Sequence, residues 1–196
     1  MKVAIIDYGA GNVRSVGNAL ETLGVSYSVI TKPGDLGNAD KVIVPGVGAA
    51  GSAMAQLRES GFAAVLPGLT VPVLGICLGL QLFADSSEEN ETKCLSILPG
   101  RVRKFRTELK VPQMGWNAVA FLKDSPLTAG IPDGSFFYFV HSYYLDANSR
   151  YVIGKASYDA ELAAVVQKDN FYGTQFHPEK SGILGLKLLS NFCELC

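Results

Sequence analysis

The chain has 196 residues, 48% of them apolar and 18% charged, a balance that supports a sizeable core and excludes an intrinsically disordered protein. Seventeen basic and eighteen acidic residues nearly cancel, and the one local basic cluster, at Arg101, Arg103, Lys104 and Arg106, does not favour a nucleic-acid partner. Four scattered cysteines, the lack of an apolar leader and the lack of any apolar run near ~20 residues argue against export and a membrane span. We therefore expect one domain over residues 1–196 in the cytoplasm.

The first half of the chain alternates short β-branched runs with helical patterns. Strands are predicted at 3–7, 28–31, 41–45 and 71–76, and helices at 12–23, from about 49, and at 78–84. Because these strands are continuously apolar, they predict a mostly parallel central sheet that is covered by helices on both faces. The predicted fold class is therefore α/β.

The second half changes to strand-like segments separated by Pro and Gly, which predict antiparallel additions to the sheet. These segments lie at 101–105, 116–121 and 151–157, and a closing strand at 171–176 precedes a helix at 182–192. A run with six aromatic residues at 136–144 is typical of a core strand. Alternation sends about half of such a run outward, so Tyr138 and Tyr143 are candidates for substrate or partner contact.

The segment Val71-Pro-Val-Leu-Gly-Ile-Cys-Leu-Gly-Leu-Gln81 carries the strongest chemical signal. A buried strand ends at Gly75, and a helix begins directly after Cys77. Glycines two residues before and two after a nucleophile permit the strained strand-to-helix turn that exposes it, and the helix N-terminus stabilises a thiolate. A lone cysteine is more often a core residue, but the Gly-x-Cys-x-Gly frame favours Cys77 as a nucleophile.

A nucleophilic cysteine needs a base, and the chain has two histidines, His141 and His177. His177 follows a predicted strand and precedes Pro178 and Glu179, an extended turn that places the His177 and Glu179 side chains on one side. The carboxylate would then fix the imidazole tautomer while the other ring nitrogen faces the sulfur. The pattern favours His177 as the base and keeps His141 as the alternative imidazole.

Val44-Pro-Gly-Val-Gly48 forms a glycine-bracketed turn at the end of another predicted parallel strand. Backbone N–H groups near Val47 or Gly48, together with that of Leu78, are candidates to stabilise the oxyanion that forms during acyl transfer. Glycine-rich turns after strands are common, so this segment by itself predicts only a tight turn.

Three motifs in this order resemble the triad-type, class I glutamine amidotransferases: Pro-Gly-Val-Gly at 45–48, Gly-Ile-Cys-Leu-Gly-Leu-Gln at 75–81 and His-Pro-Glu-Lys-Ser at 177–181. Three further segments are similar to the glutaminase subunits of imidazole glycerol phosphate synthase, namely Asp-Tyr-Gly-Ala-Gly-Asn at 7–12, Met-Gly-Trp-Asn at 114–117 and Tyr-Phe-Val-His-Ser-Tyr at 138–143. The resemblance spans residues 3–192 and implies a flavodoxin-like architecture.

The resemblance also implies a reaction and its residues. Glutamine would be hydrolysed to glutamate and ammonia through a thioester on Cys77, with His177 as base and acid and Glu179 orienting His177. The remaining binding roles fall on the oxyanion residues Gly46, Val47, Gly48 and Leu78 and on the glutamine-binding residues Gln81, Ser142 and Tyr143. No metal and no cofactor are implied.

The same resemblance implies a partner. Ammonia would pass through a channel into a cyclase subunit of (βα)8 fold, with which this chain forms a heterodimer in histidine biosynthesis. Four residues are expected at that interface: Asn12, Trp116, Tyr138 and Lys180. A single tryptophan is by default a core residue, so the interface role of Trp116 depends on the resemblance.

Several other interpretations are weaker. The glycines of segment 7–12 suggest a dinucleotide fingerprint, but Arg14 occupies the third glycine position, and a tight turn with Asn12 as helix cap is sufficient. Cys193 and Cys196 have redox spacing without a second ligand pair and are expected to be an incidental pair at a helix end, and Cys94 is expected to be structural or idle. A subunit of another ammonia-using synthase, a different Cys-His-Glu hydrolase and a non-catalytic scaffold remain alternative hypotheses.

Overall fold

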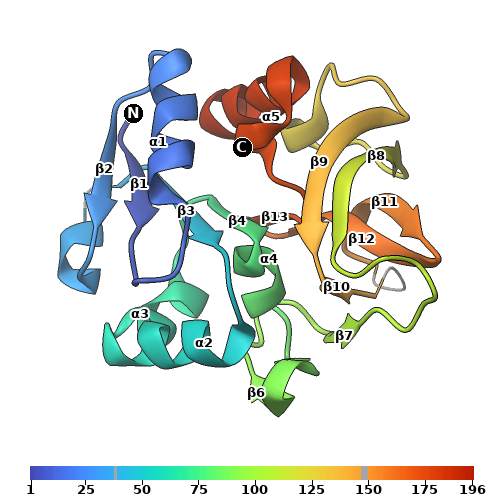
Figure 1. The fold of residues 1–196 in the computed structure, drawn as a ribbon. Coiled ribbons are helices and arrows are strands. Elements are labelled where there is room, and N and C mark those ends of the chain that lie inside the picture. The colour runs from blue at the N-terminus through green and yellow to red at the C-terminus, as the bar shows by residue number, and fades with distance from the viewer. Residues whose placement is uncertain (38, 147–149) are drawn as a thin grey trace.

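A computed structural model describes residues 1–37, 39–146 and 150–196 and contains a nine-stranded central sheet (Figure 1). One half of the sheet is parallel, and its strands follow in the order β2 (Tyr27–Ile30), β1 (Val3–Ile6), β3 (Lys41–Gly46), β4 (Val73–Cys77) and β13 (Phe171–Thr174). The other half is antiparallel and continues with β12 (Ala160–Lys168), β11 (Val152–Tyr158), β8 (Gln113–Phe121) and β9 (Ser135–His141). The predicted parallel core with antiparallel additions is confirmed.

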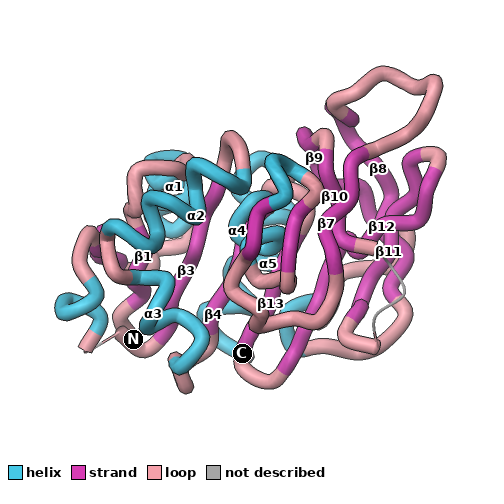
Figure 2. Tube along the Cα trace, turned by 90° about the horizontal axis from the view of Figure 1, so that it is seen from below, coloured by secondary structure: helices cyan, strands magenta, loops and turns pink. Residues whose placement is uncertain are grey.

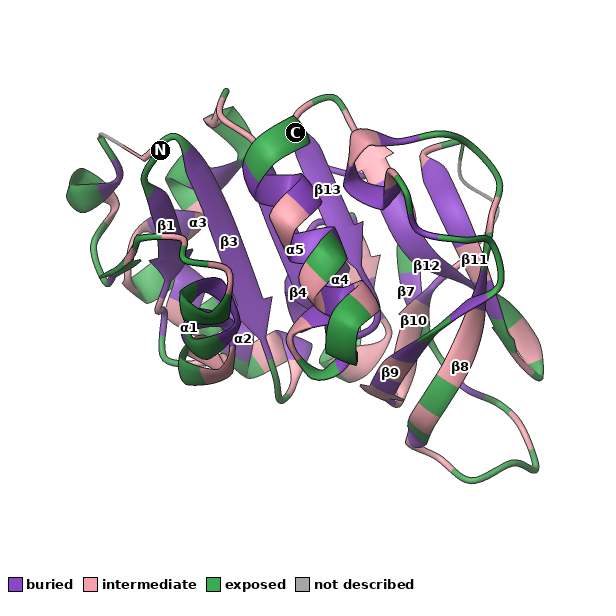
Figure 3. Ribbon diagram, turned by 90° about the horizontal axis from the view of Figure 1, so that it is seen from above, coloured by how far each residue is buried: buried purple, intermediate pink, exposed green. Residues whose placement is uncertain are grey.

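Helices cover both faces of the parallel half (Figure 1). One face carries α1 (Val13–Thr22) and α5 (Gly182–Leu195), and the other carries α2 (Ala50–Glu59), α3 (Phe62–Val65) and α4 (Leu78–Leu82). Alternate residues of β1 enter two different cores: Val3 and Ile5 pack with α1 and α5, whereas Ala4 and Ile6 pack with α2 and α4. This two-sided burial, visible in Figure 3, explains why the strand is apolar at every position.

A second, four-stranded sheet lies beside the antiparallel half (Figure 2). Its order is β10 (Tyr143–Leu145), β7 (Arg101–Lys104), β5 (Ser86–Ser87) and β6 (Thr92–Lys93). The predicted strand at 136–144 therefore divides at Ser142, because the chain leaves the large sheet after β9 and enters the small one at β10. Strand β8 also begins earlier than its apolar pattern predicts, since it pairs with β9 as far as Gln113 opposite His141.

Short 3-10 turns connect these elements at Pro33–Leu36, Leu66–Gly68, Glu89–Glu91, Pro126–Thr128 and Pro178–Lys180. The predicted cap is confirmed at the start of α1, where the Asn12 side chain accepts a hydrogen bond from the Ser15 N–H at 3.3 Å. Three members of the basic cluster form ion pairs with carboxylates, Arg101 with Glu91, Arg103 with Asp146 and Arg106 with Glu88. No helix in the described ranges is long and apolar enough to cross a membrane.

Candidate active site

The three predicted catalytic segments meet at the carboxyl ends of neighbouring parallel strands, where open α/β sheets bind their ligands. Gly46, the last residue of β3, lies opposite Cys77, the last residue of β4, and His177 follows shortly after β13, which pairs with β4. A cavity of about 290 Å³ opens at this edge. Eight of the predicted site residues line it: Val47, Gly48, Cys77, Leu78, Gln81, Ser142, Tyr143 and His177.

Cys77 adopts the strained conformation that its glycine neighbours predict. Its φ and ψ are 53° and −105°, a region that non-glycine residues seldom occupy, and its exposed fraction is 6%. A Cβ atom at Gly75 would lie 2.7 Å from Phe83 Cε2, and one at Gly79 would overlap the Val44 carbonyl oxygen. Both glycines are therefore required for the strand-to-helix turn that presents the thiol to the cavity.

His177 and Glu179 form a buried pair. His177 Nδ1 lies 2.8 Å from Glu179 Oε1, and the two side chains are 2% and 1% exposed. The extended backbone of His177, with φ −97° and ψ 97°, places both side chains on one side as predicted. Glu179 therefore takes Nδ1, and Nε2 is the ring nitrogen left for the Cys77 side chain.

The electrostatics of this pair favour a charged imidazole. Burial alone lowers the pKa of His177, but the hydrogen bonds and the charges of Cys77 and Glu179 outweigh burial and raise this pKa to about 10. The ring therefore holds a proton at neutral pH, on the residue that neighbours Cys77. Such an arrangement suits a nucleophile paired with a general acid.

The backbone of His177 is fixed by β9. The His177 N–H donates to the Tyr138 carbonyl oxygen at 2.9 Å, and the Ser181 hydroxyl bridges the two segments by accepting from the Tyr138 N–H at 3.0 Å and donating to the His177 carbonyl oxygen at 2.6 Å. The imidazole thus takes its position from the antiparallel half of the sheet, while the thiol takes its position from the parallel half.

His141, the alternative imidazole, also lines the cavity but has a different character. Its Nδ1 lies 2.8 Å from the Tyr143 carbonyl oxygen, so Nδ1 carries the proton. Burial, opposed by this hydrogen bond and assisted by the His177 charge, lowers the pKa of His141 to about 4. A neutral ring of such low basicity is a poor general base at neutral pH, and the geometry therefore favours His177.

A polar network crosses the floor of the cavity. Gln81 Nε2 donates to the Tyr143 carbonyl oxygen at 2.7 Å and to Gln175 Oε1 at 3.1 Å, and Gln175 Nε2 lies 3.7 Å from Cys77 Sγ. The Ser142 carbonyl oxygen accepts from the Phe105 N–H at 3.1 Å. The carbonyl oxygens of Ser142 and Tyr143 are therefore already hydrogen-bonded within the protein.

The predicted oxyanion turn follows β3 directly. Gly48 has a φ of 100°, which favours glycine, and the Val47 side chain is 42% exposed. Within the ranges that the structure describes, the N–H groups of Val47 and Gly48 donate to no other backbone group. Leu78, whose N–H is the third predicted donor, is the first residue of α4.

Sequence reasoning missed some residues of this cavity. Glu89 lines it from a 3-10 turn, and no local pattern marks it because its position depends on the small sheet. Gln175, which no sequence pattern marks, is fully buried next to the cavity and lies between Gln81 and Cys77. Pro112 and Val140 also line the cavity.

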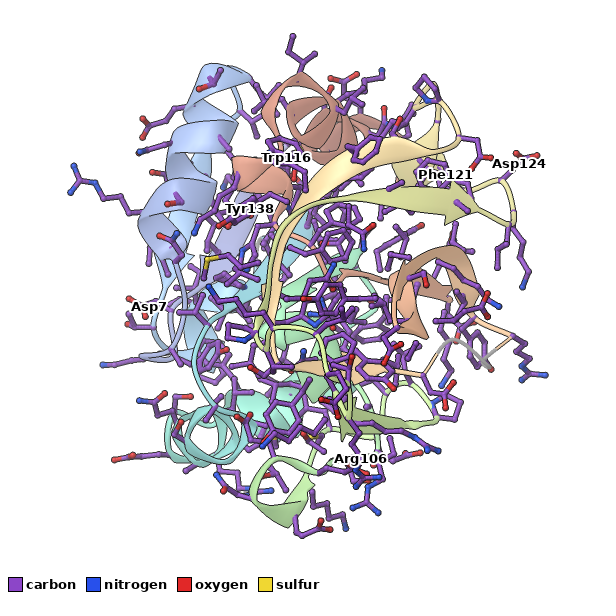
Figure 4. All side chains as sticks on the ribbon, turned by 45° about the vertical axis from the view of Figure 1, so that its right-hand side comes forward. Asp7, Arg106, Trp116, Phe121, Asp124 and Tyr138 are labelled. Atoms are coloured by element: carbon purple, nitrogen blue, oxygen red, sulfur yellow. The ribbon has the colours of Figure 1, made fainter. Side chains whose placement is uncertain are left out.

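The four predicted interface residues do not line the cavity. Trp116 is 56% exposed on β8 and lies opposite Tyr138 on β9, with the ring centroids 6.2 Å apart (Figure 4). Lys180 is exposed at the end of the 3-10 turn that contains Glu179, and Asn12 is half-buried as the cap of α1. Met114 and Phe136 extend the apolar surface around Trp116, with exposed fractions of 63% and 58%.

The other three cysteines lie outside this cavity. Cys94 and Cys193 are buried and Cys196 is half-buried. Burial raises the pKa of each thiol to about 11, which suppresses the reactive thiolate.

Comparison with known proteins defines the class of this fold and site. Residues 4–195 match the family model of glutamine amidotransferase class-I, and the chain belongs to this family. Its fold is similar to PurLQS from Thermotoga maritima, with a TM-score of 0.75, 18% identity and coverage of 98% of this chain and 97% of that chain. A glutamine amidotransferase from the same organism has a TM-score of 0.66 and 17% identity, with coverage of 99% and 81%.

Curated relatives define the branch of the family. The chain is 48% identical to imidazole glycerol phosphate synthase subunit HisH from Methanosarcina mazei, over 100% of this chain and 99% of the relative. It is 47% identical to the HisH subunit from Methanocaldococcus jannaschii, over 98% and 99%, and 48% identical to that from Bacteroides fragilis, over 100% of both. Among class-I glutamine amidotransferases, the chain belongs with the HisH subunits, and the resemblance of its motifs is confirmed.

Proposed function

We propose that this chain is the glutaminase subunit of imidazole glycerol phosphate synthase and that Cys77, His177 and Glu179 carry the hydrolysis of glutamine. One observation carries the residue assignment: a cysteine with a φ of 53° faces the same cavity as an imidazole whose far nitrogen is held by a buried carboxylate. The 48% identity to HisH subunits over the full chain supports the pathway.

In the first half-reaction, the Cys77 thiolate attacks the side-chain amide carbon of glutamine, and the carbonyl oxygen becomes an oxyanion. The imidazolium of His177 then donates its proton to the amide nitrogen, the C–N bond breaks, and ammonia leaves a thioester on Cys77. The raised pKa of His177, about 10, supports its role as the acid in this step.

In the second half-reaction, neutral His177 takes a proton from water, and the hydroxide attacks the thioester carbon. The C–S bond breaks, glutamate leaves, and the thiolate and imidazolium are restored. Glu179 keeps Nδ1 protonated throughout, so that Nε2 exchanges the proton. The N–H groups of Leu78 and of the Gly46–Gly48 turn stabilise the oxyanion of both tetrahedral intermediates.

The partner in this proposal is a cyclase of (βα)8 fold, which receives the ammonia through a channel in a heterodimer. The apolar surface formed by the exposed Met114, Trp116 and Phe136 beside the half-buried Tyr138 supports a docking role, because large exposed aromatic side chains are typical interface anchors. This surface lies close to the proposed catalytic residues, because the carbonyl oxygen of Tyr138 accepts a hydrogen bond from the His177 N–H.

The assignment of Cys77 is tested by Cys77→Ala in a complex with the cyclase. Synthesis of imidazole glycerol phosphate from glutamine should fall to background, while synthesis from added ammonium salt should match the unaltered complex. This separation is expected because Cys77 supplies ammonia and does nothing to the acceptor. Loss of both activities in an assembled complex, or retention of glutamine use, would contradict the assignment.

The docking surface is tested by Trp116→Ala and the matched control Leu122→Ala, which removes an apolar side chain of similar exposure, 51%, directly after the end of β8. Titration with the cyclase should show at least about tenfold weaker binding for Trp116→Ala and a change within about twofold for Leu122→Ala. Equal effects of the two changes would place the interface elsewhere.

A further inference from the structure

Tyr8 lies between β1 and α1, in a segment whose sequence predicts only a tight turn. Its side chain is 5% exposed, and its hydroxyl donates to the Pro45 carbonyl oxygen at 3.1 Å. Burial, and then the charge of Cys77, raise the pKa of Tyr8 well above its usual range. The hydroxyl is therefore a permanent donor at neutral pH, and it lies near the nucleophile without taking part in proton transfer.

The acceptor of this hydrogen bond, the Pro45 carbonyl oxygen, belongs to the peptide that precedes the predicted oxyanion turn. Pro45 is the next-to-last residue of β3, and Gly46 after it lies opposite Cys77. The proline ring fixes φ near about −65°, so ψ alone determines the direction of the Pro45–Gly46 peptide. A hydrogen bond to the Pro45 carbonyl oxygen restrains this ψ. The Tyr8 hydroxyl thus orients the peptide that enters the predicted oxyanion turn.

Gly46 is confined between Tyr8 and the start of α4. A Cβ atom at Gly46 would lie 3.0 Å from the Tyr8 hydroxyl oxygen, 2.7 Å from the Gly79 nitrogen and 2.8 Å from Leu78 Cβ. The Tyr8 hydroxyl and the residues that follow Cys77 therefore surround the position that a Gly46 side chain would occupy, and they leave no room for one. Removal of the hydroxyl removes one of these three close neighbours of Gly46.

A second anchor holds the far end of the turn. The Ala50 N–H, at the start of α2, donates to Glu89 Oε2 at 2.6 Å. Residues 46–49 lie between the two anchors, and they include Gly48 with its φ of 100°. The two hydrogen bonds thus hold the chain at both ends of this short stretch, and Tyr8 holds the end that is nearer to the nucleophile.

We propose that Tyr8 is a positioning residue for glutamine hydrolysis, whose hydroxyl holds the Pro45 carbonyl oxygen and thereby aims the N–H groups of the Gly46–Gly48 turn at the oxyanion. This inference rests on the proposed function. Tyr8 acts through the turn and contacts neither glutamine nor the reacting atoms. Without its hydroxyl, the donors are aligned for a smaller fraction of the time, so turnover falls while glutamine binding is preserved.

The first test observes the turn directly in Tyr8→Phe. Labelling proline with ¹³C at the carbonyl carbon and glycine with ¹⁵N isolates the four Pro–Gly peptides of the chain, at 33–34, 45–46, 67–68 and 99–100. Loss of the hydrogen bond should shift or broaden the NMR signal of the pair 45–46 and leave the other three unchanged as internal references. An unchanged signal for 45–46 would overturn the proposal whether or not the protein hydrolyses glutamine.

The second test is kinetic and uses the complex with the cyclase. For Tyr8→Phe we expect kcat for glutamine to fall about tenfold, KM to stay within about twofold and ammonia-dependent synthesis to be unaffected. The matched control is Tyr172→Phe, which removes the hydroxyl of another buried tyrosine, 6% exposed. Tyr172 lies near the amino-terminal end of β13, whereas His177 follows the carboxyl end of this strand. An unchanged kcat, a rise in KM alone or an equal loss in Tyr172→Phe would overturn the proposal. Absence of glutamine turnover in the unaltered complex would refute the proposed function instead, and the NMR signals would then decide the role of Tyr8.

Discussion

His177 Nδ1 lies 2.8 Å from Glu179 Oε1, so the carboxylate holds the Nδ1 proton and leaves Nε2 to exchange a proton with the substrate. In the proposed mechanism, His177 carries the proton to and from the substrate, whereas Glu179 only orients the ring. We therefore expect His177→Asn to lower glutamine turnover about ten-thousandfold and Glu179→Gln about a hundredfold. Steady-state glutaminase assays of the complex measure both values.

The informative control for this pair is His141→Asn, because His141 is the other imidazole in the cavity. A loss in His141→Asn that equals the loss in His177→Asn would make His141 the base. Equal losses in His177→Asn and Glu179→Gln would also require a different assignment of the proton carrier.

The local geometry of the proposed nucleophile and its proposed base is predictable from sequence because the signals are local. The glycines around Cys77 are dictated by close backbone approaches, and the spacing of His177 and Glu179 follows from an extended chain. The alternation of strands and helices predicts the parallel core for the same reason. Local patterns of this kind cannot say which distant segments meet.

Contacts between distant segments account for what sequence reasoning missed. Gln81 meets Tyr143 only because the chain leaves β9 for the small sheet at Ser142, a division that the continuous aromatic run conceals. Glu89 reaches the Ala50 N–H from a turn 39 positions away. Neither contact follows from periodicity, since both depend on how the second sheet packs beside the first.

The Gln81–Gln175 pair leads to a prediction about substrate binding. Gln175→Leu removes the amide that links Gln81 to the Cys77 thiol and leaves one Gln81 hydrogen bond unmade. An unmade buried hydrogen bond costs about 1–3 kcal/mol, so kcat/KM for glutamine should fall about tenfold or more. Gln167→Leu on β12 is the matched control and should stay within about twofold. Similar losses in the two variants would indicate a general loss of stability.

The two histidines should affect stability in separate pH windows. The folded-state pKa of His141 is about 4, below its ordinary 6.5. Between pH 6.5 and pH 4, His141 is therefore protonated in the unfolded chain and neutral in the folded chain. Stability is therefore lost as pH falls from 6.5 toward 4, by up to about 3 kcal/mol. His141→Asn should flatten this slope, as measured by urea unfolding at pH 7 and pH 4.5.

The protonation of His177 should make stability depend on pH in the opposite direction. Its folded-state pKa is raised to about 10, so its contribution to stability is complete below pH 6.5 and is lost as pH rises toward 10. His177→Asn should flatten the slope above pH 6.5 and leave the acid slope intact. A variant that changes both slopes, or the wrong one, would contradict the assignment of the shifts to these two rings.

The turn at Gly46–Gly48 leads to the last prediction, which concerns control by the partner. Gly48 permits more than one peptide orientation, and release of ammonia without an acceptor would be wasteful. We expect glutamine hydrolysis to rise sharply from the subunit alone, through the complex with the cyclase, to the complex with its nucleotide ligand. Coupling requires that the ligand favour one state of the turn over the other.

Val47→Pro tests whether the Val47 N–H is the donor that becomes aligned, because proline has no N–H to give. Loss of one oxyanion donor typically costs about a hundred- to a thousandfold in turnover, so the stimulated rate should drop by that factor while the rate of the isolated subunit changes little. Val47→Ala keeps the N–H and should retain stimulation, which separates the donor from the side chain. Equal rates in all three states of the unaltered protein would refute coupling. If the Val47→Pro complex is still stimulated, the donor is Gly48, because its N–H is the other one in the turn that donates to no backbone group in the described structure.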